Sequence, residues 1–312
     1  MSDFFDAIAF GSATIDFFLE SLQFGKKLTL PYDSKIEVNQ KMVSSGGGGT
    51  NVSVGLSRLG LKTAVVARLG QDQFAPLIID QLRQENVWTK LLAIQPGEKT
   101  DSSTILVNSL GKKVILVSRG PTRLESGNIN WNKLKSSYFH LASLEGNLKL
   151  AKKIINHAKT NNIKLFWNPG SRELAQKDKL LPLLNKVQFL ALNQKEAEEL
   201  LNQKLEASSF WPKVFKLPVP LIAITQSQKG CYLVFPQEGK KIHLKAVKTR
   251  AMETTGAGDA FASGLIAGLF YQKTPKQAAR WGLTNGASVV SHFGAKTGLL
   301  TKKEIKKWLK KP

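Results

Sequence analysis

Short apolar runs alternate with stretches of helical periodicity along most of the 312-residue chain. Helical spacing is clearest in residues 51–60, where Val52 and Leu56 share one face. The apolar runs are β-prone and bounded by turn residues, and they predict core strands at residues 6–10, 63–69, 138–143, 164–168, 188–193 and 221–225. Strands that alternate with helices in this way predict an α/β fold, in which helices cover both faces of a mainly parallel sheet.

Two further helices are predicted near the carboxyl end, at residues 257–270 and 274–293. The helix at residues 257–270 contains two glycines, Gly264 and Gly268, that lie one turn apart. Glycine lets a neighbouring element approach the helix backbone closely. We therefore expect the helix at residues 257–270 to be buried.

Two segments do not show this alternation of strands and helices. Residues 102–118 contain two β-prone runs around a glycine-containing turn, which predicts a hairpin, and residues 15–43 are typical of strands and turns. Together they predict a small β-sheet lid, built from about residues 12–43 and 100–120. No repeat or linker divides the sequence, so residues 1–312 are expected to form a single domain that includes this lid.

The composition is that of an ordinary globular protein, with 42% hydrophobic and 22% charged residues. No run approaches the roughly 18–20 apolar residues that cross a bilayer, so no membrane association is expected. The first ten residues lack the basic and apolar regions of a signal peptide. The single cysteine, Cys231, excludes an intrachain disulfide. These features predict a cytoplasmic protein.

The formal net charge of +22 raises the question of nucleic-acid binding. Lysines are spread along the whole chain, however, and a dense basic run occurs only at residues 302–312. Neither zinc-finger spacing nor an aromatic RNA-binding pattern accompanies them. We expect no specific nucleic-acid partner, and we interpret the charge as a solvated surface that attracts anionic substrates.

A run of four glycines, Gly46 to Gly49, precedes Thr50, Asn51 and a predicted helix. Consecutive glycines suit a sharp turn or a close approach to a ligand. Asn51 fits either a helix cap or a ligand contact. The sequence contains no P-loop motif, so any nucleotide must be bound without one.

A single acid, Asp259, stands at the start of the glycine-flanked helix in the stretch TTGAGDAF. One interpretation is structural, because Asp favours the positive end of a helix. The other is chemical: the backbone N–H groups of Gly256, Ala257 and Gly258 bind an anion while Asp259 takes a proton beside it.

The stretches GGGGTN and TTGAGDAF, in this order and spacing, resemble the two signature motifs of the ribokinase-like (PfkB) carbohydrate kinase family. The resemblance covers nearly the whole chain, since it extends to GSATID, LGQDQF, NQKE and SHFGAKTG. It implies a three-layer α/β/α sandwich with a small inserted β-sheet lid. It also implies an ATP-dependent, Mg²⁺-assisted transfer of phosphate to a hydroxyl of a small sugar.

The resemblance also implies roles for individual residues. Asp259 would be the general base, and Gly256, Ala257 and Gly258 would form the anion hole for the transferred phosphoryl group. The residues expected to bind the sugar substrate are Asp16, Gly47, Gly48, Asn51 and Glu145. Those expected to bind the nucleotide are Asn193, Thr225, Gly230 and Asn285.

Glu196 is expected to hold Mg²⁺ through water. Asn193 and Glu196 equally fit a capping box at the start of a helix, and both roles are compatible. Glu253 replaces the Asp that helps to hold a monovalent cation in relatives, so K⁺ is an optional cofactor.

Two other functions stay open. One is a nucleoside or sugar-phosphate kinase of the same family, with Arg119 and Arg123 as candidate phosphate contacts. The other is a basic binding protein that keeps the fold without catalysis, against which the intact Asp259 counts. The expected partner is the small sugar or nucleoside, and a homodimer through the lid is a further expectation.

Overall fold

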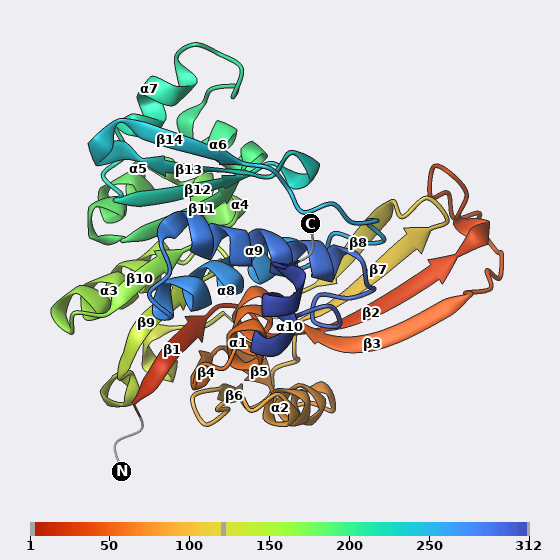
Figure 1. The fold of residues 1–312 in the computed structure, drawn as a ribbon. Coiled ribbons are helices and arrows are strands. Elements are labelled where there is room, and N and C mark those ends of the chain that lie inside the picture. Colours follow the sequence, from red (N-terminus) through yellow and green to blue (C-terminus); the bar gives the residue numbers. More distant parts are fainter. Residues whose placement is uncertain (1–3, 120–122, 311–312) are drawn as a thin grey trace.

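The main sheet of the computed structural model contains eight strands within the described residues, which are 4–119 and 123–310 (Figure 1). Its spatial order is β14-β13-β12-β11-β10-β9-β1-β4. Neighbours from β12 to β4 pair in parallel, whereas β13 and β14 are antiparallel. The strands are β1 (Phe5–Phe10), β4 (Thr63–Val66), β9 (Ser136–Leu141), β10 (Lys164–Trp167), β11 (Phe189–Asn193), β12 (Leu221–Thr225), β13 (Cys231–Phe235) and β14 (Lys240–Leu244).

The two faces of this sheet are both buried, which is why its strands are continuous apolar runs in the sequence. In β1, Ala7 and Ala9 belong to one core cluster, whereas Ile8 and Phe10 belong to the opposite one. The alternation follows from the two-residue period of a strand. The sequence prediction was wrong at residues 63–69, because β4 ends at Val66 and β5 (Arg68–Gly70) pairs separately with β6 (Ala93–Gln95).

Helices cover each face, which confirms the predicted three-layer sandwich (Figure 1). One layer contains α1 (Gly48–Arg58), α8 (Ala257–Phe270), α9 (Pro275–Val290) and α10 (Lys302–Trp308). The other contains α3 (Leu148–Thr160), α4 (Ser171–Leu174), α5 (Lys177–Leu180), α6 (Gln194–Leu201) and α7 (Phe210–Phe215), and α2 (Phe74–Gln84) packs beside β4. In the part of the chain that the structure describes, no helix is both long and apolar enough to traverse a bilayer.

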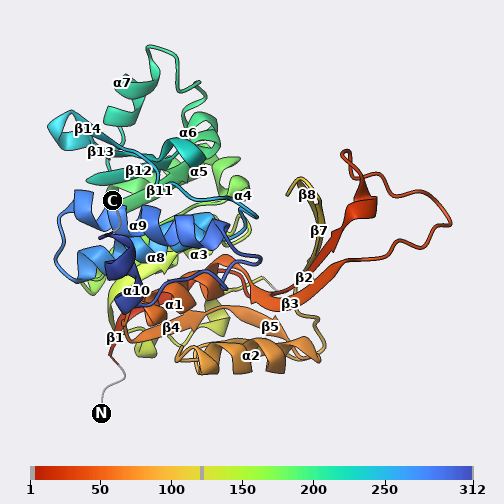
Figure 2. The same ribbon diagram turned by 45° about the vertical axis from the view of Figure 1, so that its right-hand side comes forward.

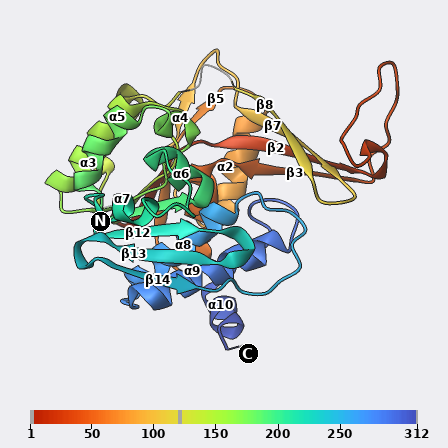
Figure 3. The same ribbon diagram turned by 90° about the horizontal axis from the view of Figure 1, so that it is seen from above.

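A second, small sheet stands away from this sandwich (Figures 2 and 3). Within the described residues it has four strands in the order β3-β2-β7-β8. They are β2 (Thr14–Ser21), β3 (Gln40–Gly46), β7 (Ser102–Asn108) and β8 (Lys113–Ser118). The antiparallel pair β7 and β8 is the hairpin predicted at residues 102–118. Strand β3 continues to Gly46, and residue 120 of the predicted lid range lies outside the described residues.

The helices α8 and α9 lie in direct backbone contact because glycine occupies their crossing. A Cβ atom at Gly264 would lie 2.8 Å from backbone atoms of Gly282. One at Gly268 would lie 2.6 Å from the Cα of Ala278. The helix predicted to be buried is therefore buried, and its small residues set its distance from α9.

Substitution of Gly264 by Ala should reduce the free energy of unfolding by about 1–3 kcal/mol, because rigid backbone must move to admit the methyl group. Gly286→Ala is the matched control in α9, since its Cβ would lie 3.4 Å from the nearest atom, the carbonyl oxygen of Ala257. That variant should be neutral, or more stable by up to about 1 kcal/mol, because Ala is the better helix former. Urea denaturation of both variants checks this, and equal effects would contradict the close-packing argument.

Candidate active site

The candidate site lies at the carboxyl ends of the parallel strands, where α/β proteins bind their ligands. Residues 11–13 follow β1 there, and Asn193 and Thr225 end β11 and β12. The amino ends of α1 and α8 meet at the same edge, since the side chains of Asn51 and Asp259 are hydrogen-bonded. The sheet topology thus brings together residues from both halves of the chain.

The glycine run forms the turn from β3 into α1. Gly47 has φ +93°, which favours glycine, and it precedes the first residue of the helix. The backbone N–H groups of Gly48 and Gly49 donate to the side-chain and backbone oxygens of Ser12, each at 3.2 Å. The turn is therefore braced by the segment that follows β1, and two of the first N–H groups of α1 are already bonded.

Asp16 lies on β2 beside this turn and is 5% exposed. Its Oδ1 accepts a hydrogen bond from the Thr14 hydroxyl at 2.9 Å, and its Oδ2 lies where a side chain at Gly46 would project. Burial raises the pKa of the Asp16 carboxyl, an effect that Thr14 and the charge of Lys296 oppose. The glycine at position 46 thus makes room for the carboxyl group at the edge of the site.

Asp259 occupies the first turn of α8, but its side chain is directed away from that helix. Its Oδ2 accepts a hydrogen bond from Asn51 Nδ2 at 2.8 Å, and Oδ1 would lie 3.6 Å from a Cβ placed on Gly48. Burial raises the pKa of Asp259 to about 6, while Asn51 and Lys296 lower it. The bond to Asn51 argues against a purely helix-capping role. The raised pKa is suited to proton transfer near neutral pH.

The turn before α8 leaves open space in front of the helix start. Gly256 has φ +77° and lies against Ala295, where any side chain would overlap. Apart from Gly258, its chain neighbours and the backbone of α8, no atom of the described residues lies within 4 Å of the Cβ position of Gly258. The N–H of Ala257 donates a long bond, 3.3 Å, to the carbonyl of Thr254. The predicted anion hole at residues 256–258 therefore opens to solvent at Gly258.

Asn193 and Glu196 form the capping box that starts α6, with reciprocal bonds of 2.9 and 2.8 Å. Burial raises the pKa of the Glu196 carboxyl, and the negative charges of Glu199 and Asp259 raise it further. Glu196 and Asp259 are thus close enough for their charges to interact. Carboxylate oxygens that repel one another fit Mg²⁺, which prefers oxygen ligands and retains several waters.

Two other predicted nucleotide residues lie near this edge of the sheet. Thr225 ends β12 and pairs with Cys231. Gly230 has φ +104° and packs so tightly on the backbone of residues 244–246 that a side chain would overlap it. Among residues 4–119 and 123–310, no three His, Cys, Asp or Glu side chains are grouped as a metal site. A bound Mg²⁺ would therefore take most of its ligands from phosphate and water.

Asn285, which was predicted to bind the nucleotide, lies in the interior of the protein. The residue is fully buried in α9. Its Nδ2 donates to the carbonyl of Ala260 at 3.0 Å, and its Oδ1 accepts from the N–H of Leu300 at 2.9 Å. Asn285 therefore joins α8, α9 and the following segment inside the core.

Glu145, a predicted substrate residue, is bound to two arginines. Its carboxylate pairs with Arg119 and lies 3.2 Å from Arg172. Arg123, the second candidate phosphate contact, accepts a bond from Arg68 through its backbone oxygen. The structure thus shows Arg119 matched with an acid, so that it is not an unpaired phosphate-binding group.

Glu253 is 2% exposed and precedes the turn at residues 256–258. Its Oε1 accepts from Lys113 Nζ at 2.5 Å and from the N–H of Thr255 at 2.7 Å. Lys113 also donates to the Thr255 hydroxyl at 2.5 Å. The positive charge beside Oε1 of Glu253 is therefore a lysine of the small sheet, whereas Oε2 is buried without a hydrogen-bond partner among the described residues.

Lys296 lies inside the site, although it entered the sequence analysis only as a member of the stretch SHFGAKTG. Its Nζ donates to the carbonyl of Ser45 at 2.5 Å, the hydroxyl of Thr50 at 2.9 Å and Oδ1 of Asn51 at 2.6 Å. Burial lowers the pKa of Lys296 to about 7. One lysine in a chain with 45 Lys and Arg residues carries no signal by itself.

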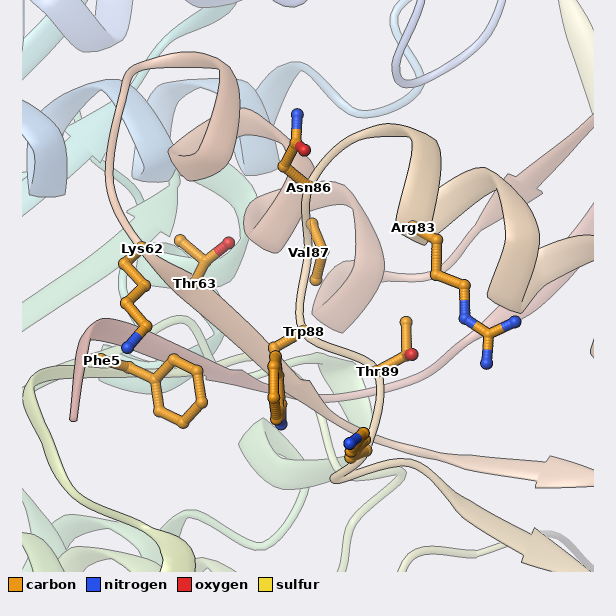
Figure 4. A pocket seen from close by; sticks show the side chains of 9 residues that line it. Phe5, Lys62, Thr63, Arg83, Asn86, Val87, Trp88 and Thr89 are labelled. Atoms are coloured by element: carbon orange, nitrogen blue, oxygen red, sulfur yellow. The ribbon is translucent and has the colours of Figure 1, made fainter. Parts of the chain in front are cut away.

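A separate pocket lies at the amino ends of β1 and β4 (Figure 4). Its lining residues are Phe5, Lys62, Thr63, Arg83, Asn86, Val87, Trp88, Thr89 and Lys90. The set includes none of the predicted site residues. It also lies at the opposite edge of the sheet from the Asn51–Asp259 pair, so we do not regard it as the active site.

Comparison with known proteins identifies the class of this site. The model of the pfkB family of carbohydrate kinases matches residues 5–302, and the chain belongs to that family. It is 26% identical to the ribokinase of Haemophilus influenzae over 306 residues, which cover 93% of this chain and 97% of the relative. It is also 26% identical to the fructokinase of Vibrio alginolyticus over 281 residues, or 85% and 91% of the two chains.

Solved structures show the same fold. Arabidopsis thaliana ribokinase complexed with ribose and ATP matches with a TM-score of 0.83 at 20% identity, covering 98% of this chain and 99% of that one. A Burkholderia thailandensis nucleoside kinase in complex with inosine matches with a TM-score of 0.78 at 17% identity, over 97% of each chain. These likenesses establish the ribokinase-like fold and leave the acceptor to be determined.

Proposed function

We propose that the protein is a kinase that transfers the terminal phosphoryl group of ATP to a hydroxyl of a small sugar. The observation that carries this proposal is the hydrogen bond between Asn51 and Asp259 in front of the open start of α8. It places a candidate base next to a helix N-terminus, where negative charge is stabilised. Membership of the carbohydrate kinase family supports the same reaction.

In this proposal Asp259 accepts the proton of the acceptor hydroxyl as the new oxygen–phosphorus bond forms and the bond to ADP breaks. The backbone N–H groups at residues 256–258 stabilise the charge of the transferred group. Asp16 and Asn51, from β2 and α1, hold the sugar hydroxyls against Gly47 and Gly48. The chemistry requires positioning and charge stabilisation, so no covalent enzyme intermediate is involved.

ATP and Mg²⁺ are the cofactors that we propose. Solved ribokinases of this fold include one with ribose and ATP and another with ADP. Glu196, with Asn193 beside it, would hold Mg²⁺ and its waters, and Thr225 and Gly230 would border the nucleotide. When bound, the metal would neutralise phosphate charge.

The acceptor is proposed to be a neutral sugar, with nucleosides and sugar phosphates as the alternatives. Glu145 neutralises Arg119, which removes one candidate contact for an acceptor phosphate. A cytoplasmic location stays a prediction; the buried, free thiol of Cys231 is compatible with it.

Asp259→Asn tests the function directly. The amide has nearly the same size but cannot take a proton, so kcat should fall by about 10²- to 10⁴-fold while both KM values change little. ATP consumption should be measured over a panel of sugars, nucleosides and sugar phosphates, with wild type and variant in parallel. A folded variant with a near-normal rate would overturn the role of Asp259, and a wild type inactive with every acceptor would overturn the proposed reaction.

Potassium should not activate the wild-type enzyme, because Lys113 already supplies a positive charge to the buried Glu253. Lys113→Met should lower kcat and make the rate respond to K⁺, since the variant leaves an uncompensated carboxylate beside the phosphate turn. Rates in KCl and in tetramethylammonium chloride of equal ionic strength measure this. Lys112→Met, which leaves the Glu253 ion pair intact, is the control. Equal stimulation of wild type and Lys113→Met would contradict the assignment.

A homodimer through the small sheet is the assembly that we propose. Strand β8 lies at the end of that sheet, and four consecutive apolar side chains on it are exposed: Val114, Ile115, Leu116 and Val117. Exposed apolar edge strands favour pairing with another chain. Light scattering should give twice the chain mass for wild type and the single-chain mass for Leu116→Lys, and a monomeric wild type would refute the dimer.

A further inference from the structure

We propose that Lys296 is a positioning residue for Asp259: its ammonium group fixes the amide of Asn51, and that amide aims the Asp259 carboxylate. The inference deepens the function proposed above and rests on it. It is carried by a continuous series of contacts. Lys296 Nζ donates to Asn51 Oδ1 at 2.6 Å, and Asn51 Nδ2 donates to Asp259 Oδ2 at 2.8 Å.

The ammonium group of Lys296 is fully engaged by the protein. A lysine has three N–H donors, and Nζ has three acceptors: Ser45, Thr50 and Asn51. These acceptors lie at the end of β3 and in the first turns of α1. No donor is left for a substrate, so Lys296 acts through the residues it holds and does not contact the reacting atoms.

The ammonium group also decides which way the Asn51 amide faces. With Oδ1 toward Lys296, the NH₂ group points to the carboxylate of Asp259. A flipped amide would direct its N–H groups at the ammonium and its oxygen at the carboxylate, so that both contacts would become repulsive. Asn51 is 4% exposed, which leaves little water to compensate a flip. Lys296 therefore locks the bond that orients Asp259.

The fixed bond leaves one oxygen of Asp259 for the acceptor. Oδ2 is occupied by the Asn51 amide, whereas Oδ1 lies 3.6 Å from the Cβ position of Gly48, on the side of the glycine turn that we propose binds the sugar. A general base must present a lone pair to the proton that it removes. The series of contacts from Lys296 thus determines which carboxylate oxygen is the base.

Charge supports the same assignment. Lys296 interacts with Asp16 on β2, Asp259 on α8, Glu85 after α2 and Arg58 on α1. Asp259 is also close to Glu196 of α6. The positive charge of Lys296 lowers the pKa of Asp259 against the effect of burial. Loss of that charge should raise the pKa of Asp259 above about 6, so that a higher pH is needed to ionise the base.

The test is Lys296→Met, which keeps the length of the side chain and removes its charge and donors. The acid limb of the kcat profile should move to higher pH by about half a unit or more, because an opposite charge near a carboxyl lowers its pKa. The rate at the plateau should fall by about tenfold, because a hydrogen bond to a charged group is lost, while KM for ATP changes little. Lys303→Met, at an exposed position of α10, should behave as wild type.

A second measurement does not depend on turnover. The pKa of the Asp259 carboxyl, followed by carbon NMR in wild type and Lys296→Met, should shift upward in the variant. An unchanged pKa, or an equal loss of kcat at every pH, would overturn the proposal. Lys296→Gln keeps amide donors without the charge, and the same criteria apply to it if the Met variant does not fold. A wild type that phosphorylates no acceptor would refute the proposed function, while the NMR titration would still test Lys296.

Discussion

The hydrogen bond between Asn51 and Asp259 joins side chains 208 positions apart, and the candidate site exists because the fold makes this contact. The contact forms because α1 and α8 pack closely together. A Cβ on Gly55 of α1 would overlap Ser263 of α8, and one on Gly264 would overlap the backbone of α9. Three helices are thereby set at short, fixed distances on one face of the sheet. The positions of Asn51 and Asp259 are therefore fixed by packed helices and not by loops.

The small sheet is tied to this rigid body at several points near the site. Strand β2 carries Asp16, and β3 continues directly into the glycine turn. Lys113 of β8 reaches the buried Glu253 just before the turn at residues 256–258. Lys296 binds the backbone of Ser45 at the end of β3. Movement of the small sheet would therefore disturb both Asp16 and the turn at residues 256–258.

The sequence predicted the sandwich because the pattern of burial is local. Strands buried on both faces are apolar runs, and the hairpin at residues 102–118 has its own turn residues. The predicted strand at residues 63–69 divides in two because β5 leaves the main sheet to pair with β6. The hydrophobic periodicity of the sequence does not indicate which strands pair.

The motifs likewise indicated Asp259, Asn51 and Asp16, which the structure gathers at one edge of the sheet. The roles of Lys113 and Lys296 depend on partners 140 and 245 positions away. In a chain so rich in lysine, only the folded contacts distinguish these two from the rest. The side chain of Asn285, which the resemblance assigns to the nucleotide, is hydrogen-bonded to Ala260 of α8 and to Leu300 beyond α9, and no sequence pattern indicates these contacts.

The two helix starts at the site differ in how many of their first N–H groups are already hydrogen-bonded. Both α1 and α8 begin after a glycine with positive φ, and both present the positive end of a helix dipole. At α1, Ser12 takes the N–H groups of Gly48 and Gly49, so this start is committed to holding the turn in place. At α8, the position of Gly258 faces open space. A phosphoryl group would therefore gain more from α8, and in the proposed reaction α1 would be the rigid wall against which the sugar is held.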